Sequence, residues 1–281
     1  MEKFGCNGLN RPIPHPVHKA ATGLIQVHHL VIVVPSFRYA WLIWASAFLL
    51  PWALLYLADP ALRRPMLWAS ALTAPFGLTQ PLFVPTYWNP PSLFDLAQRT
   101  GFDLESLVFC FAIGGLGVAA YRAMTRVRLA SMDHQAHSLP RHRWHLFALA
   151  SPLVVFGGLM VLGWNPIYPG ILALFAGAVA TVLCRPDLFR NALFGGAAFL
   201  ALYTVFLLGL KWIWPGYIES VWNLDALFAL RPAGLPLEEL LFGFAFGMYW
   251  SSVYEHLTWH QRAAALDPPN HVPIPHLKAP S

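Results

Sequence analysis

The sequence predicts an all-α integral membrane protein of about seven transmembrane helices, arranged as two parallel three-helix repeats plus a connecting helix. Hydrophobic residues make up 57% of the 281 residues and charged residues only 11%, against roughly 25% charge in soluble domains. The second half of the chain repeats a motif of the first half, and most arginines fall in alternate loops. The net charge of +5 gives no indication of nucleic-acid binding.

Seven segments are long and apolar enough to cross a bilayer, which requires about 20 mostly apolar residues. They are Tyr39–Leu57, Met66–Tyr87, Leu104–Tyr121, Leu146–Trp164, Ile167–Cys184, Leu193–Leu210 and Leu237–Tyr254. Pro75 and Pro81 predict a kink in the second segment. The stretch from Leu24 to Pro35 is apolar but short, and we interpret it as an interfacial or partly inserted segment, with an eighth span as the alternative.

The distribution of basic residues predicts the orientation. If the seven segments cross the membrane in turn, one side receives Arg63, Arg64, Arg122, Arg126, Arg128, Arg141, Arg143, Arg185, Arg190, Arg262 and Lys278. The positive-inside rule then places the C-terminus in the cytoplasm and the N-terminus outside. Residues 1–20 contain no apolar run that could form the core of a signal peptide, so we expect the N-terminus to be retained.

The repeat is visible as two copies of W-N-x-x-x-L-F-x-L, which begin at Trp88 and Trp222 and are 134 residues apart. After a slip of one residue, Glu105 aligns with Glu238 at a separation of 133 residues. Helices one to three then correspond to helices five to seven, and we expect a pseudo-twofold axis along the membrane normal. The predicted organisation is an N-terminal tail (1–38), a first repeat (39–122), a basic loop with a connecting helix (123–164), a second repeat (165–256) and a C-terminal tail (257–281).

Each copy places glutamate in the first turn of a long apolar helix: Glu105 in the first, Glu238 and Glu239 in the second. Carboxylates near hydrocarbon are costly and are candidates for function. The alternative is ordinary helix-start chemistry, because carboxylates there complement the helix dipole. Since Glu238 shares an i, i+4 stripe with Phe242 and Phe246, we expect Glu238 to face a cavity and Glu239 to tune or accept its proton from the side. The stripe of Gly243 and Gly247 resembles a helix-packing face.

Trp222-Asn223, then Gly234-Leu235-Pro236-Leu237-Glu238-Glu239-Leu240-Leu241-Phe242, and a closing Tyr254-Glu255 resemble the signature of the lycopene cyclase domain family. These are small membrane carotenoid cyclases of the heterodimeric or fused tandem-repeat type. The resemblance covers residues from about 39 to 256, and the second copy matches the P-x-E-E pattern fully. The first copy departs from it, because Asp103 replaces the proline and Ser106 replaces the second glutamate.

The resemblance implies a redox-neutral, proton-initiated ring closure of a linear polyene end, an intramolecular lyase or isomerase reaction that needs no cofactor. This chemistry requires a protonated carboxylic acid, a proton acceptor and electron-rich rings that stabilise a cation. The candidate catalytic residues are Glu238, Glu239 and Glu105, and the candidate substrate-binding residues are Trp88, Asn89, Trp222, Asn223, Phe109, Phe242 and Phe246. The expected partners are membrane lipid and a linear carotenoid, with other carotenoid enzymes or a second copy of the chain as further options. The expected location is the bacterial inner membrane.

The histidines do not lead us to expect a metal site. Glu255, His256 and His260 have the order E-H-x-x-x-H, which differs from the H-E-x-x-H of zinc peptidases. We interpret the cluster of His134, His137, His142 and His145 as a solvated or headgroup-facing surface of a basic loop.

Two functional alternatives stay open. One is a catalytically degenerate protein that binds carotenoid or scaffolds a biosynthetic complex. The other is a 3+1+3 small-molecule transporter, although spans three, five and seven carry few polar groups for a pathway. A retinal protein is disfavoured because the last span contains no lysine, and a prenyl transferase because Asp95 and Asp225 stand alone.

Overall fold

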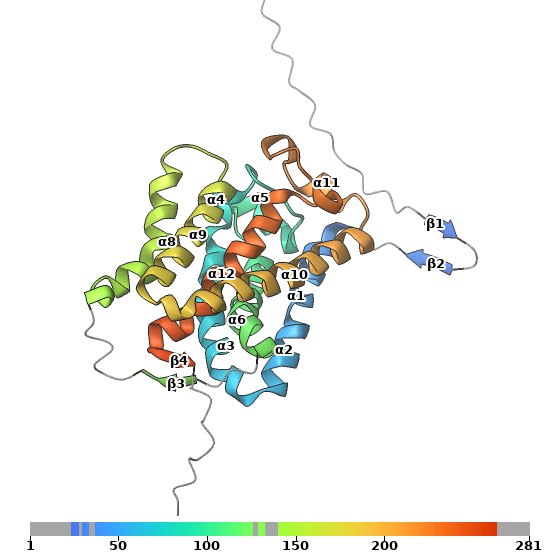
Figure 1. Cartoon of the computed structure of the whole chain (residues 1–281). Coiled ribbons are helices and arrows are strands. Elements are labelled where there is room, and N and C mark those ends of the chain that lie inside the picture. Colours follow the sequence, from blue (N-terminus) through green and yellow to red (C-terminus); the bar gives the residue numbers. More distant parts are fainter. Residues whose placement is uncertain (1–23, 28–29, 34–36, 126–128, 133–139, 263–281) are drawn as a thin grey trace, which may run out of the picture.

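The computed structural model describes residues 24–27, 30–33, 37–125, 129–132 and 140–262, and these residues form an almost entirely helical bundle (Figure 1). The longer helices are α1 (Ala40–Ala47), α2 (Leu49–Ala58), α3 (Pro60–Thr73), α6 (Leu104–Thr125), α8 (His145–Met160), α9 (Ile167–Cys184), α10 (Phe189–Ile213) and α12 (Leu237–Thr258). Short helices α4 (Gln80–Phe83), α5 (Leu96–Thr100) and α11 (Tyr217–Val221) lie together at one end of the bundle. We call this end the glutamate end, because α6 and α12 begin there.

Each of the seven predicted segments contains a helix, and Ile167–Cys184 agrees residue for residue. Among the described residues, four helical stretches are long and apolar enough to cross a membrane: Phe37–Ala58, Leu104–Thr125, Ile167–Cys184 and Pro186–Ile213. The helix His145–Met160 is apolar but shorter. The described residues therefore form an almost entirely helical fold with helices suited to a membrane, whereas the seven-span layout stays a prediction.

The second segment departs from its predicted bounds. Its helix α3 begins at Pro60 and not at Met66, because the Asp59 side chain caps it by accepting from the Ala61 N–H at 2.9 Å. The α-helix ends at Thr73, and a 3-10 stretch, Ala74–Thr79, follows before α4. The break coincides with Pro75, which confirms the predicted kink.

The Leu24–Pro35 segment forms two antiparallel strands, β1 (Leu24–Val27) and β2 (Leu30–Val33). The alternative of an eighth helical span there is wrong, because each strand has only four residues. His28 and His29 lie outside the described residues. At the other end of the bundle, β3 (Leu129–Ser131) pairs with β4 (His260–Arg262), and we call this end the β3–β4 end.

Small residues allow the helices that carry the glutamates to pack closely on their neighbours. A Cβ atom added to Gly247 of α12 would lie 2.6 Å from the Gly195 carbonyl of α10, and one added to Gly243 would lie 2.8 Å from the Tyr203 ring. One added to Gly114 of α6 would collide with the Thr73 side chain of α3. The predicted packing role of Gly243 and Gly247 is thus confirmed, and it fixes how α12 is rotated.

The two halves of the chain meet at both ends of the bundle through residues that the repeat alignment makes equivalent. Trp88 and Trp222 form an antiparallel bridge in which the Asn89 N–H donates to the Val221 carbonyl (2.8 Å) and the Asn223 N–H to the Tyr87 carbonyl (2.9 Å). At the β3–β4 end, Arg122 Nε lies 4.0 Å from Glu255 Oε1.

The predicted solvated surface of histidines is wrong for two of its members. His142 and His145 are 6% and 7% exposed, because Trp259 stacks on the His145 ring and also contacts His142. His134 and His137 lie outside the described residues, as does the tail after residue 262.

Candidate active site

A cavity of about 520 Å³ lies between α6, α10 and α12, and α1, α3, α4, α8, α9 and the Ala74–Thr79 stretch also contribute to its wall. Its volume falls within the range of small-molecule sites, roughly 300 to 1,000 Å³. The wall is dominated by aromatic and aliphatic side chains, among them Trp41, Trp68, Phe83, Trp88, Phe109, Phe206, Trp222, Phe242, Phe246, Tyr249 and Trp250. Such a wall fits an apolar ligand.

Glu239 is the one carboxylic acid among the described residues that line this cavity. It is 4% exposed and accepts hydrogen bonds on both oxygens. The Tyr203 hydroxyl donates to Oε2 at 2.6 Å, the Trp222 indole N–H donates to Oε1 at 2.7 Å, and the Tyr87 hydroxyl also donates to Oε1. Three donors from three separate segments therefore fix the carboxyl group in one orientation.

Glu238 points away from the cavity. Its Oε1 accepts from the Phe228 backbone N–H at 2.8 Å and from the Tyr168 hydroxyl at 2.8 Å. The carboxyl is 1% exposed, and its Oε2 has no hydrogen-bond partner among the described residues. Glu238 thus holds the loop that follows Trp222 against the start of α12.

The expectation that Glu238 faces the cavity and Glu239 lies to its side is wrong. An i, i+4 stripe is only part of a helix face, because i+3 and i+7 lie on the same side. The cavity face of α12 follows that wider pattern through Glu239, Phe242, Phe246, Tyr249, Trp250, Val253 and Leu257. Gly243 turns toward α10, which directs Glu239, and not Glu238, into the cavity.

The first copy has the same helix orientation with different side chains. Ser106, Phe109, Cys110 and Ile113 of α6 line the cavity, so Ser106 occupies the place equivalent to Glu239. Glu105 repeats the arrangement of Glu238: its Oε1 accepts from the Leu93 N–H at 2.6 Å, and its buried Oε2 has no partner among the described residues.

Asp103 explains one departure of the first copy from the P-x-E-E pattern. Its carboxylate accepts from the Ser106 backbone N–H, which is N-cap geometry for α6. Burial raises the pKa of Asp103, while this hydrogen bond opposes the shift. The second copy starts α12 after Pro236, which offers no side-chain cap; there the Leu237 N–H donates to the Leu230 carbonyl at 3.2 Å and the Glu239 N–H to the Pro236 carbonyl at 3.1 Å. The two helix starts therefore solve the same capping problem with different residues.

Part of the chain is similar to a known protein family. Residues 165–257 match the family model described as lycopene cyclase. This segment is therefore similar to lycopene cyclases. No curated protein and no solved structure matches the chain. The match spans the second copy of the repeat and indicates a carotenoid cyclase type of function in a membrane environment.

The matched segment supplies Glu239, Trp222, Phe242 and Phe246 to the cavity, and the preceding half of the chain supplies Trp88 and Phe109. All five predicted aromatic residues therefore lie in the cavity wall. Trp88 and Trp222 are neighbours, with ring centroids 5.3 Å apart. Phe242 lies 5.9 Å from Tyr203, and Phe246 lies 5.7 Å from Phe242, again between ring centroids.

Asn89 and Asn223 do not line the cavity, so the structure gives these predicted substrate-binding residues no part in its wall. Both are exposed. The Asn223 side chain donates to the Thr86 carbonyl at 3.1 Å, and the Asn89 side-chain oxygen accepts from Gln98 at 3.4 Å. The Asn223 side chain thus joins the loops of the two halves, whereas the Asn89 side chain makes its contact within the first half.

Sequence reasoning missed Tyr87 and Tyr203, which hold the Glu239 carboxyl. Tyr87 directly precedes the repeated Trp88, so proximity to the motif was a usable signal. Tyr203 lies in the middle of the apolar α10, and no motif marks it.

Proposed function

We propose that this protein is a membrane carotenoid cyclase that closes a ring at the end of a linear, lycopene-type polyene without net oxidation or reduction. The observation that carries the proposal is Glu239, a single oriented carboxylic acid in the wall of an aromatic cavity. The lycopene cyclase match over residues 165–257 supports the same substrate class.

The reaction balances with one proton given and one taken. The acid adds a proton to the terminal double bond, which leaves a tertiary carbocation. The electron pair of a neighbouring double bond forms the ring C–C bond and moves the positive charge into the ring. Loss of a proton from an adjacent ring carbon restores a double bond, so the product has the mass of the substrate.

Glu239 is assigned both proton transfers. Burial among apolar groups favours the neutral carboxyl before reaction, and the carboxylate formed by protonating the substrate becomes the base that receives the ring proton. The phenol groups of Tyr87 and Tyr203 and the Trp222 N–H can stabilise that carboxylate while the cation exists, because all three donate to it. The scheme requires no second carboxyl group in the cavity.

The aromatic wall suits the cationic intermediate. Faces of tryptophan, tyrosine and phenylalanine attract cations and offer no nucleophilic lone pair comparable to that of a carboxylate or water. Trp88, Trp222, Phe109 and Phe242 surround the carboxyl end of the cavity. They can hold the charge while excluding water, which would otherwise trap the cation as an alcohol.

The two copies are proposed to be related by a pseudo-twofold axis between α6 and α12. The paired hydrogen bonds between Asn89 and Val221, and between Asn223 and Tyr87, exchange with each other under the 134-residue offset. Arg122 and Glu255 also occupy equivalent positions under the 133-residue offset. Contacts between equivalent residues are expected beside such an axis, and they support a single cavity shared by both copies.

Within this arrangement Glu238 and Glu105 are positioning residues. Each secures the loop that follows the repeated Trp-Asn pair of its own copy, by accepting from one backbone N–H. The seven-span layout with an external N-terminus is part of the proposal. A reporter that is active only outside the cytoplasm, fused after Ser281, should be inactive, and a strongly active fusion would contradict this orientation.

The function is tested by expressing the full chain in a bacterial host that accumulates lycopene, followed by pigment chromatography and mass spectrometry. Monocyclic or bicyclic product of unchanged mass is expected. If a well-inserted protein binds lycopene and leaves it linear, the scaffold alternative is favoured, and the cyclase proposal fails for this substrate.

A further inference from the structure

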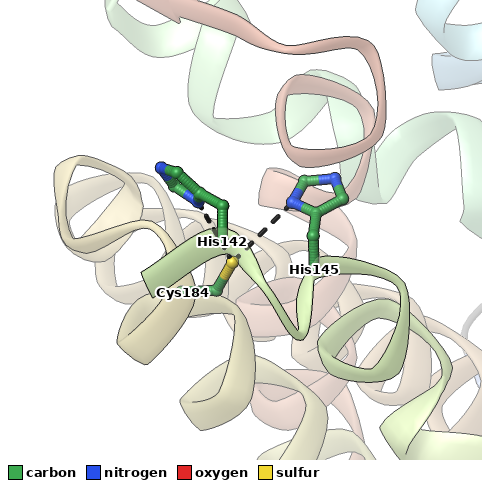
Figure 2. Close-up of side chains that lie close together, drawn as sticks. All are labelled: His142, His145 and Cys184. Carbon is green, nitrogen blue, oxygen red and sulfur yellow. Dashed lines mark hydrogen bonds between the residues drawn. The ribbon is translucent and has the colours of Figure 1, made fainter. Parts of the chain in front are cut away.

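Two histidines and a cysteine come together near the β3–β4 end of the bundle (Figure 2). His142 ends a 3-10 turn (Pro140–His142), His145 begins α8, and Cys184 is the last residue of α9. Figure 2 shows the sulfur between the two imidazole rings. All three side chains are buried, and their ligand atoms lie within 4.8 Å of one another.

The distances match those of a tetrahedral metal site. The Cys184 sulfur lies 3.4 Å from His142 Nδ1 and 3.7 Å from His145 Nδ1. Zinc binds thiolate at about 2.3 Å and imidazole at about 2.0–2.1 Å, so a tetrahedral angle separates sulfur from nitrogen by about 3.6 Å. The side chains could therefore accept the ion with small rotations.

A third imidazole, that of His256 in α12, packs against His145 of this group. His256 is 0% exposed, and neither of its ring nitrogens has a hydrogen-bond partner among the described residues. Its ring centroid lies 4.2 Å from that of His145. A buried imidazole without partners is costly unless it meets a donor, an acceptor or a metal ion.

We propose that His142, His145, Cys184 and His256 bind a structural Zn²⁺ ion. Imidazole nitrogen and thiolate sulfur are both ligands that zinc accepts, and four protein ligands would leave no open position for chemistry. The neighbouring Arg185 does not oppose the cation with an unpaired charge, because its guanidinium donates to both Asp187 carboxylate oxygens at 2.9 and 2.6 Å. The ion would tie the start of α8 to the ends of α9 and α12.

The site differs from the one considered in the sequence. There, Glu255, His256 and His260 were weighed as a local group along one helix. In the structure the helix ends at Thr258, and His260 Nδ1 lies 2.8 Å from the Thr258 hydroxyl. The ligands proposed here come from three segments and could be recognised only after folding.

The test measures metal content in the full chain, purified in detergent from cells grown with zinc. Wild type should hold about one zinc ion per chain. Cys184→Ser and His145→Ala should hold almost none, whereas Cys110→Ser, a matched control in α6, should keep the wild-type content. His256→Gln should weaken zinc affinity by about tenfold or more.

Wild-type protein without stoichiometric zinc, or Cys184→Ser with the wild-type content, would overturn the proposal. If the variants fail to fold, the wild type decides the question. A zinc chelator should lower its Tm, and Zn²⁺ but not Mg²⁺ should restore it. A Tm that is the same with and without the chelator would overturn the structural role. These outcomes do not depend on whether the protein cyclises carotenoids.

Discussion

The two copies of the repeat present the same helix face to one cavity but place different chemistry on it. In the second copy Glu239 faces the cavity and accepts three hydrogen bonds, whereas the equivalent Ser106 of the first copy has a buried hydroxyl with no partner among the described residues. The preceding glutamates, Glu238 and Glu105, are used alike in both copies, each receiving a loop N–H. In the proposed reaction, the shared glutamates position loops and the asymmetric position supplies the acid.

The largest effect should come from Glu239→Gln. The amide keeps the size of the side chain but cannot deliver a proton, and loss of a general acid and base costs about 10²- to 10⁴-fold in rate. The equivalent change in the first copy, Ser106→Ala, should leave the cyclisation rate within about twofold of wild type, because a partnerless hydroxyl contributes little. Rates are measured as cyclic pigment formed per amount of inserted protein. Equal losses in the two variants would abolish the distinction between the copies.

The next effect concerns the donors that hold Glu239. Tyr203→Phe removes one charge-assisted hydrogen bond of about 1.5–3 kcal/mol, which corresponds to a rate loss of about tenfold to a hundredfold. Tyr87→Phe should act in the same direction with a smaller loss, because the Trp222 N–H still donates to the same oxygen. Tyr249→Phe is a suitable control, since its hydroxyl donates to the Leu149 carbonyl and not to a carboxyl group. If Tyr203→Phe cyclises as fast as this control, the hydrogen bonds to Glu239 do not contribute to the rate.

Substitution of the equivalent glutamates Glu238 and Glu105 should lower the stability of the protein more than its cyclisation rate. Glu238→Ala and Glu105→Ala each leave a loop N–H without its acceptor, at a cost of about 1–3 kcal/mol in the free energy of unfolding. We expect the Tm in detergent to fall in both variants, and somewhat further for Glu238→Ala, because the Tyr168 hydroxyl also loses its acceptor there. A large fall in only one of them would show that the two loops are not equivalent.

The smallest change is expected from restoring a second acid. Ser106→Glu in the Glu239→Gln background should not recover cyclisation. Tyr87 donates to Glu239, but the residue equivalent to Tyr87 under the 134-residue offset is Val221, whose side chain has no donor for a glutamate at position 106. Pigment analysis of the double variant decides this. Recovery to wild-type rate would show that either copy can supply the acid without the surrounding donors.

Helix positions could be predicted from the sequence because hydrophobic length is a local property. Ile167–Cys184 was predicted residue for residue, whereas α3 began six residues earlier than expected because of the cap at Asp59. The aromatic wall was also predictable, since Trp88, Trp222 and their neighbours belong to the repeat.

Which of Glu238 and Glu239 faces the cavity could not be predicted from the i, i+4 spacing of Glu238 and Phe242 alone. It depends on Gly243 and Gly247 packing against α10, a contact between helices. Tyr203 and the burial of His142 and His145 were missed for the same reason. Their partners, Glu239, Trp259 and Cys184, lie 36 or more residues away in the sequence.

The central claim is that Glu239, and not its neighbour Glu238, transfers the proton. The most direct measurement compares initial cyclisation rates of Glu239→Gln and Glu238→Gln with lycopene as substrate, at equal membrane content. Glutamine at position 238 can still accept from the Phe228 N–H and the Tyr168 hydroxyl, so this variant should stay within a few-fold of wild type. Glu239→Gln should be slower by about 10²-fold or more. The reverse order, with Glu238→Gln inactive and Glu239→Gln active, would contradict the account.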